Sequence, residues 1–155
     1  MNGPEWPTVR GTLQQGHQVA SGKAGDPRFP QGTLALQAPL FAKMGFPIDA
    51  FHPGTLNLSI APLQYEVLQP VRTFNNLKWH ADTAAEDFSF FDCRIRLLGC
   101  GPFNKALVYR PHPETKPEHC QDPSILEILT PWLNGASYGT TLELQLHPQQ
   151  IRILA

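Results

Sequence analysis

The residues with the clearest chemical potential form Pro53-Gly54-Thr55-Leu56-Asn57, where a Pro-Gly turn leads into a predicted strand. Successive side chains of a strand point to opposite faces, so Thr55 and Asn57 would share one face. A hydroxyl and an amide carbonyl are hard oxygen donors that suit Mg²⁺, which keeps several waters and shares substrate phosphates. The segment therefore predicts a magnesium site, and the alternative is an ordinary turn before an edge strand.

A second segment, Ser21–Phe29, has the composition of a phosphate-binding loop. Glycine-rich turns expose successive backbone N–H groups that can surround phosphate oxygens, and Gly22 and Gly25 provide such turns. Lys23 and Arg28 would add positive charge. The alternative is a plain surface loop, because a proline in the segment offers no N–H group.

Two features of the second half have both a functional and a structural interpretation. Trp132, in Trp132–Gly135, could stack on a nucleobase, and the alternative is a core tryptophan beside an apolar helix. Glu127 is the last residue of Ser124-Ile125-Leu126-Glu127, which fits a capping box at a helix start.

These segments, in this order, resemble the archaeal CTP-dependent riboflavin kinases. The first block covers Gly16–Ile60, including Met44-Gly45-Phe46 and the Pro-Gly-Thr-Leu-Asn run. The second block runs from Ala106 through Thr115 and His119 to Ile125-Leu126-Glu127-Ile128-Leu129-Thr130-Pro131. Between the two blocks the chain is similar only as a set of strands.

The resemblance implies a closed six-stranded cradle-loop β-barrel and a Mg²⁺-dependent phosphotransferase. This enzyme would move the γ-phosphoryl group of CTP, or of another nucleoside triphosphate, to riboflavin or a related alcohol, giving FMN and a nucleoside diphosphate. The implied roles are Mg²⁺ on Thr55 and Asn57, the nucleotide at Gly22, Lys23, Gly25, Arg28, Trp132, Asn134 and Gly135, and the flavin or other acceptor at Thr115 and Glu127. No residue is identified as a catalytic base.

Two departures from the family pattern motivate an alternative. The glycine loop is interrupted, and extra residues surround Pro117–Pro123. A non-catalytic flavin- or nucleotide-binding module that kept the barrel but lost phosphoryl transfer would tolerate both changes, because folds outlast their chemistry.

The polar segment Arg110–His119 carries four potentially cationic side chains, namely Arg110, His112, Lys116 and His119. It would suit an anionic acceptor better than uncharged riboflavin, and the alternative is a solvated loop. A further possibility is a metal-dependent hydrolase that uses His112 and His119, although neither lies in a recognised zinc spacing.

The elements that must position these residues are mostly short strands. Sixteen prolines and twelve glycines are spread along the chain, as is typical of all-β proteins. Alternation predicts strands, with a bulge at Phe90-Phe91, over Thr8–Leu13, His17–Ala20, Thr33–Leu36, Thr55–Ile60, Tyr65–Leu68, Thr73–Trp79, Phe88–Leu98, Lys105–Tyr109, Thr141–Leu146 and Ile151–Leu154. Helices are predicted over Pro39–Met44, before Gly45, and over Pro123–Thr130. The predicted class is all-β with short helices.

Composition limits the remaining possibilities. At 155 residues we expect one domain, 1–155, and the formal charge of −1 with scattered basic residues argues against a nucleic-acid partner. Three cysteines without a paired framework, no basic or apolar leader and no membrane-length apolar run indicate a cytoplasmic protein with small-molecule partners. The oligomeric state is not predicted.

Overall fold

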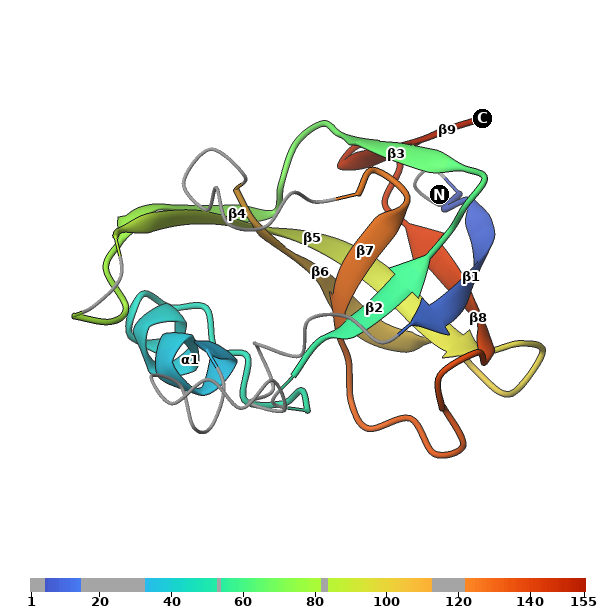
Figure 1. The fold of residues 1–155 in the computed structure, drawn as a ribbon, viewed down its shortest axis with the longest axis horizontal. Coiled ribbons are helices and arrows are strands. Elements are labelled where there is room, and N and C mark those ends of the chain that lie inside the picture. Colours follow the sequence, from blue (N-terminus) through green and yellow to red (C-terminus); the bar gives the residue numbers. More distant parts are fainter. Residues whose placement is uncertain (1–4, 15–32, 53, 82–83, 113–121) are drawn as a thin grey trace.

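The structure, a computed structural model, describes residues 5–14, 33–52, 54–81, 84–112 and 122–155 (Figure 1). The described elements, in chain order, are β1 (Thr8–Gln14), α1 (Thr33–Lys43), β2 (Leu56–Ser59), β3 (Gln64–Val67), β4 (Arg72–Leu77), β5 (Glu86–Leu97), β6 (Asn104–Pro111), β7 (Ile125–Leu129), β8 (Thr141–Leu146) and β9 (Ile151–Leu154). No helix among these residues is long and apolar enough to cross a membrane.

Six strands close into an antiparallel barrel in the order β1-β2-β7-β6-β5-β8, and β8 returns to β1. The predicted fold class, all-β around a closed six-stranded barrel, is confirmed. Aliphatic side chains fill the interior, among them the fully buried Leu58 of β2. Gly11 of β1 makes room for it, because a Cβ atom there would lie 2.5 Å from Leu58 Cγ.

A second core lies outside the barrel, where β4 and the first half of β5 project beyond it (Figure 1). Helix α1 covers the outer face of this projection. Phe41 of α1 is fully buried, and its ring centroid lies 5.0 Å from that of Phe74, 5.6 Å from that of Phe88 and 5.1 Å from that of Phe90. The outer face of this projection is therefore buried under α1, and at Phe90-Phe91 of β5 both faces of the sheet are buried.

Burial on both faces explains why the predicted bulge at Phe90-Phe91 is wrong. The pairing of β5 with β6 runs without a break from Phe88 to Ile95. Phe90 belongs to the core under α1 and Phe91 to the barrel core, so the two apolar neighbours simply point to opposite faces. The irregularity lies in β4 instead, between Phe74 and Leu77.

The first helix begins earlier than predicted. Its observed range is Thr33–Lys43, so the strand predicted over Thr33–Leu36 is wrong and Pro39 lies inside the helix. Its end is as predicted at Gly45, which has a φ of 85°. The Phe46 N–H donates to the Phe41 carbonyl at 2.9 Å and the Gly45 N–H to the Ala42 carbonyl at 3.0 Å, which is a Schellman ending.

The helix predicted over Pro123–Thr130 is wrong, because this segment forms β7. Leu126 and Ile128 point into the barrel while Leu129 points into the core under α1. A strand with apolar residues on both faces shows no clean alternation, so its sequence imitates an apolar helix surface. The predicted capping-box role of Glu127 is therefore wrong as well, because no helix begins here. The Ser124 hydroxyl instead donates to the Leu63 carbonyl at 2.7 Å.

The remaining strand predictions that fall on described residues are confirmed. Each observed strand begins and ends within two residues of its predicted range over Thr8–Leu13, Thr55–Ile60, Tyr65–Leu68, Thr73–Trp79, Phe88–Leu98, Lys105–Tyr109, Thr141–Leu146 and Ile151–Leu154. β3 and β9 form a separate antiparallel pair. The strand predicted over His17–Ala20 lies outside the described residues.

Candidate functional site

Three oxygen-bearing side chains meet on the outer face of the barrel: Thr55 just before β2, Asn57 on β2 and Glu127 on the neighbouring strand β7. Thr55 and Asn57 are half-buried, whereas Leu58 between Asn57 and Ser59 is fully buried, so the predicted alternation holds. The Thr55 hydroxyl donates to Glu127 Oε1 at 3.1 Å, and Asn57 lies directly opposite Glu127 in the strand pairing. The structure thus unites the predicted metal residues with a predicted acceptor residue.

Further polar side chains continue this line of residues across the next strand, β6, to α1. Tyr109 of β6 lies directly opposite Glu127 and is buried under the helix. Its hydroxyl donates to Gln37 Oε1 at 2.6 Å. Burial raises the pKa of Tyr109 well above its usual value, and the carboxylates of Glu127 and Glu86 add to the rise. Tyr109 therefore keeps its proton and remains a hydrogen-bond donor.

Gln37 is fully buried, and its Nε2 group has no hydrogen-bond partner. An unpaired donor in a core costs free energy, about 1–3 kcal/mol in proteins. Together, Asn57, Glu127, Tyr109 and Gln37 form a continuous polar row from β2 to α1, set in otherwise apolar packing. We call these four residues and Thr55 the polar row.

Trp132 lies in the loop that follows β7, five residues after Glu127 of the polar row. Its side chain is 71% exposed, so the interpretation of a core tryptophan is wrong. The Trp132 ring centroid lies 5.0 Å from that of His52, and the His52 N–H donates to the Thr130 carbonyl at 3.0 Å. His52, one member of this exposed ring pair, therefore lies three residues before Thr55 along the chain.

Asn134 and Gly135 lie farther along the same loop and are exposed. Gly135 has a φ of 90°, a left-handed conformation that favours glycine. Among the described residues, no hydrogen bond joins either of them to Thr55, Asn57 or Glu127. Their predicted nucleotide role stays a prediction.

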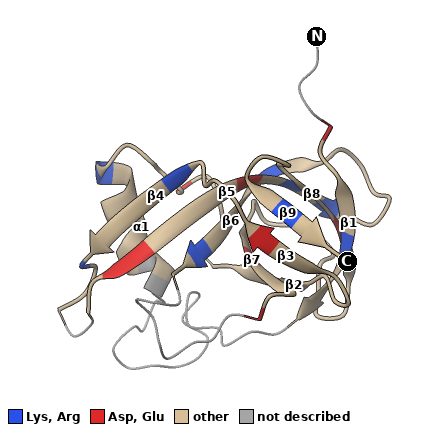
Figure 2. Ribbon diagram, turned by 90° about the horizontal axis from the view of Figure 1, so that it is seen from above, with Lys and Arg blue, Asp and Glu red and all other residues tan. Residues whose placement is uncertain are grey.

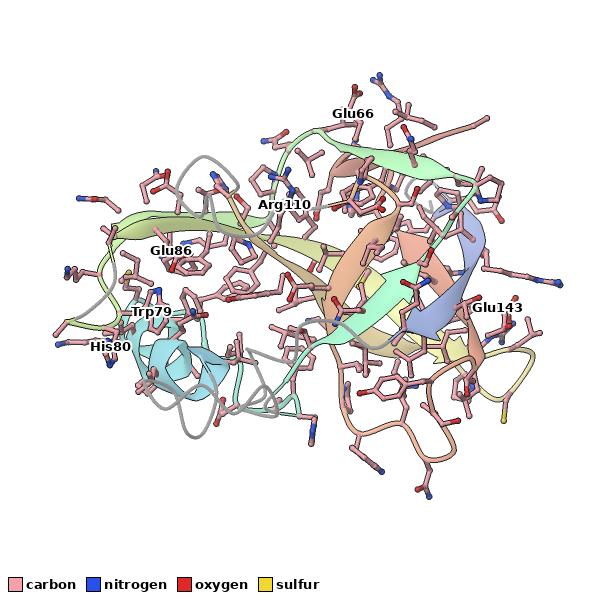
Figure 3. The ribbon with its side chains drawn as sticks, in the orientation of Figure 1. Glu66, Trp79, His80, Glu86, Arg110 and Glu143 are labelled. Carbon is pink, nitrogen blue, oxygen red and sulfur yellow. The ribbon has the colours of Figure 1, made fainter. Side chains whose placement is uncertain are left out.

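Several predicted site residues lie outside the described residues, namely Gly22, Lys23, Gly25, Arg28 and Thr115. Of the basic segment Arg110–His119, only the part up to His112 is described. Arg110 follows Tyr109 on β6 and so points to the opposite face of the sheet (Figure 3). Arg110 therefore does not join Glu127 at the polar row.

The donor set of the polar row fits a hard cation. Thr55, Asn57 and Glu127 offer a hydroxyl, an amide carbonyl and a carboxylate, all of them oxygen donors. Within the described ranges no cluster of three or more His, Cys, Asp or Glu side chains could hold a metal ion. A cation here would thus take most ligands from water and phosphate, as Mg²⁺ does.

Sequence reasoning missed Gln37 and His52. Gln37 was missed because the predicted helix began after it. Had the helix been started at Thr33, the spacing Leu34, Gln37, Phe41 would have put a polar residue on the buried face. His52 precedes the Pro-Gly turn and gave no signal without the ring contact to Trp132.

In the ribbon view of Figure 2, basic and acidic residues both occur along the described strands. The sequence matches no protein-family model, and no curated protein is significantly similar to it.

Proposed function

We propose that this protein is a Mg²⁺-dependent phosphotransferase that moves a γ-phosphoryl group from CTP, or another nucleoside triphosphate, to riboflavin or a related alcohol. The observation that supports this proposal most directly is the 3.1 Å hydrogen bond between Thr55 and Glu127. Phosphoryl transfer needs the phosphates and the acceptor hydroxyl held side by side. The bond joins Thr55, which is suited to bind the metal and phosphates, to Glu127, which is suited to bind the acceptor.

Each residue of the proposed site has a defined task. Thr55 and Asn57 hold and orient the triphosphate together with Mg²⁺, which supplies neutralisation of phosphate charge when bound. The Glu127 carboxylate accepts a hydrogen bond from the acceptor hydroxyl and so directs its oxygen toward the phosphates. The exposed Trp132 provides a face on which the base can stack.

The test is FMN formation from riboflavin and Mg²⁺ with each nucleoside triphosphate in turn. Thr55→Ala and Asn57→Ala should each lower the rate by about 100-fold, because misplaced phosphates react slowly. Ser59→Ala is the matched control, since Ser59 is half-buried on the same face of β2 but pairs with Ile125 instead of Glu127.

Three results contradict the proposal or its residue assignment. Calorimetric binding of flavin or nucleotide without any product would favour a binding module. No binding and no product would remove the proposed function altogether. Wild-type rates in both Thr55→Ala and Asn57→Ala would show that these residues do not hold the phosphates.

A further inference from the structure

A second group of polar side chains lies on the other face of the sheet, away from α1. Thr73 of β4, Ser89 of β5 and Arg110 of β6 are direct cross-strand neighbours. Figure 3 shows Arg110 on the side of β5 and β6 opposite α1. This group is separate from the polar row, because Arg110 and Tyr109 point to opposite faces of β6.

The hydrogen bonds of this group converge on Ser89. Its Oγ lies 2.6 Å from His112 Nε2 and 2.9 Å from Thr73 Oγ1. The His112 backbone N–H donates to the Asp87 carbonyl at 2.8 Å, which fixes the residue beside β5. Ser89 is therefore held between an imidazole nitrogen and a second hydroxyl.

This is the local geometry of an activated nucleophile. A serine hydroxyl within hydrogen-bond reach of an imidazole can pass its proton to the ring as the oxygen attacks. In the tautomer with a lone pair on Nε2, Ser89 donates to His112 and accepts from Thr73. The Thr73 and Ser89 hydroxyl protons then each have an acceptor, and the Ser89 proton points at the base.

Arg110 places a positive charge beside the same serine. Its Nε atom is buried and has no hydrogen-bond partner, whereas its guanidinium also hydrogen-bonds the Tyr65 hydroxyl; within the described ranges no carboxylate forms an ion pair with it. A partly desolvated guanidinium stabilises negative charge more strongly than one in water. It is thus placed to stabilise an oxyanion that develops next to Ser89.

We propose that Ser89 is the nucleophile of a second site, which hydrolyses an activated carboxylic ester. Ser89 Oγ bonds to the carbonyl carbon, His112 Nε2 takes the Ser89 proton, and Arg110 stabilises the oxyanion. The carbon–alkoxide bond then breaks and His112 returns the proton to the leaving alcohol. Water, deprotonated by His112, releases the acid and restores Ser89. This inference does not rest on the proposed phosphotransferase.

A purely structural role would produce the same hydrogen bonds but no reactivity, so the test measures covalent chemistry. A fluorophosphonate probe reacts with activated serines: the Oγ–phosphorus bond forms, the phosphorus–fluorine bond breaks, and the serine proton passes to the base. We expect the intact protein to take up one probe, mapped to Ser89 by peptide mass spectrometry, and to release 4-nitrophenolate from 4-nitrophenyl acetate.

Variants assign the roles. Ser89→Ala should abolish labelling, and His112→Gln should slow it by at least about 100-fold, the usual contribution of a general base. Ser124→Ala is the matched control, because the Ser124 hydroxyl donates to a backbone carbonyl instead of contacting an imidazole. Circular dichroism and native mass would confirm that each variant is folded.

Mapping the label on the wild-type protein keeps the test decisive even if a variant fails to fold. A label on any residue other than Ser89, or no label at all, would overturn the inference. Equal labelling rates in wild type and His112→Gln would also overturn it, since the imidazole would then play no part.

Discussion

The two halves of the outer face of β5 differ sharply. In the first half, Phe88 and Phe90 are fully buried under α1. In the second half the same face carries Arg94 and Arg96, and Arg96 donates to Glu143 of β8 at 2.9 Å. The outer-face side chains of β5 are therefore apolar where α1 covers the strand and charged where the strand is exposed to solvent. The polarity of the outer-face side chains therefore depends on whether another element covers them and does not follow from the barrel alone.

The polar row runs from the uncovered outer face of the barrel into the core under α1. Thr55, Asn57 and Glu127 are half-buried, while Tyr109 and Gln37 continue under the helix. A border is where polar side chains can be held rigidly and still be reached by a ligand. That position adds to the Thr55–Glu127 hydrogen bond in support of the proposed function there.

The comparison is tested most strongly by removing an aromatic ring from each half. Phe41→Ala should cost about 3–5 kcal/mol, because it deletes a fully buried ring at the centre of the covered half. Phe103→Ala is the control in the uncovered half, where the half-buried ring lies 4.3 Å from the Arg96 guanidinium and should contribute about 1 kcal/mol or less. Urea unfolding measures both values, and similar losses would contradict the contrast.

The same contrast explains which elements could be predicted. β8, with Leu142, Leu144 and Leu146 alternating with polar residues, is buried on one face only, and its predicted bounds were correct. β7 and the centre of β5 are buried on both faces. For β7 the sequence wrongly predicted a helix, and for β5 it wrongly predicted a bulge. Alternation reports one buried face, so it fails where a helix buries the second.

The candidate site was predictable only in part. Thr55 and Asn57 could be placed on one face from local spacing, because β2 alternates. Their contact with Glu127 depends on the pairing of β2 with β7, which are separated by more than sixty residues. The Ser89–His112 pair likewise depends on the β5–β6 pairing, and spacing along the chain gave no indication of it.

A double-mutant cycle sharpens the contrast within the covered half. Tyr109→Phe should cost about 1–3 kcal/mol, because it leaves the buried Gln37 amide without its remaining partner. Gln37→Leu should cost a similar amount by leaving the Tyr109 hydroxyl unpaired. The double variant should be more stable than either single variant, since no buried polar atom of the pair remains.

Thermal and urea unfolding of the four proteins measure the coupling. Additive losses in the double variant would show that the Tyr109–Gln37 bond is not the reason for either loss. They would also remove the argument that the polar row extends under α1.

The smallest effect is expected in the uncovered half and depends on pH. The Gly99 backbone N–H, at 3.0 Å, and then the Arg96 guanidinium hold the pKa of Glu143 below its ordinary value of 4.5. A lowered folded-state pKa means that the ionised form stabilises the fold. This contribution is present above pH 4.5 and is lost as the pH falls through the lowered value. Glu143→Gln, which cannot ionise, should therefore lose less stability on acidification than wild type. Urea midpoints measured from neutral pH down to pH 3 would show this difference. Parallel curves for wild type and Glu143→Gln would contradict the stabilising role of ionised Glu143. The control is Glu66→Gln, at the exposed Arg152–Glu66 pair, which should follow wild type closely.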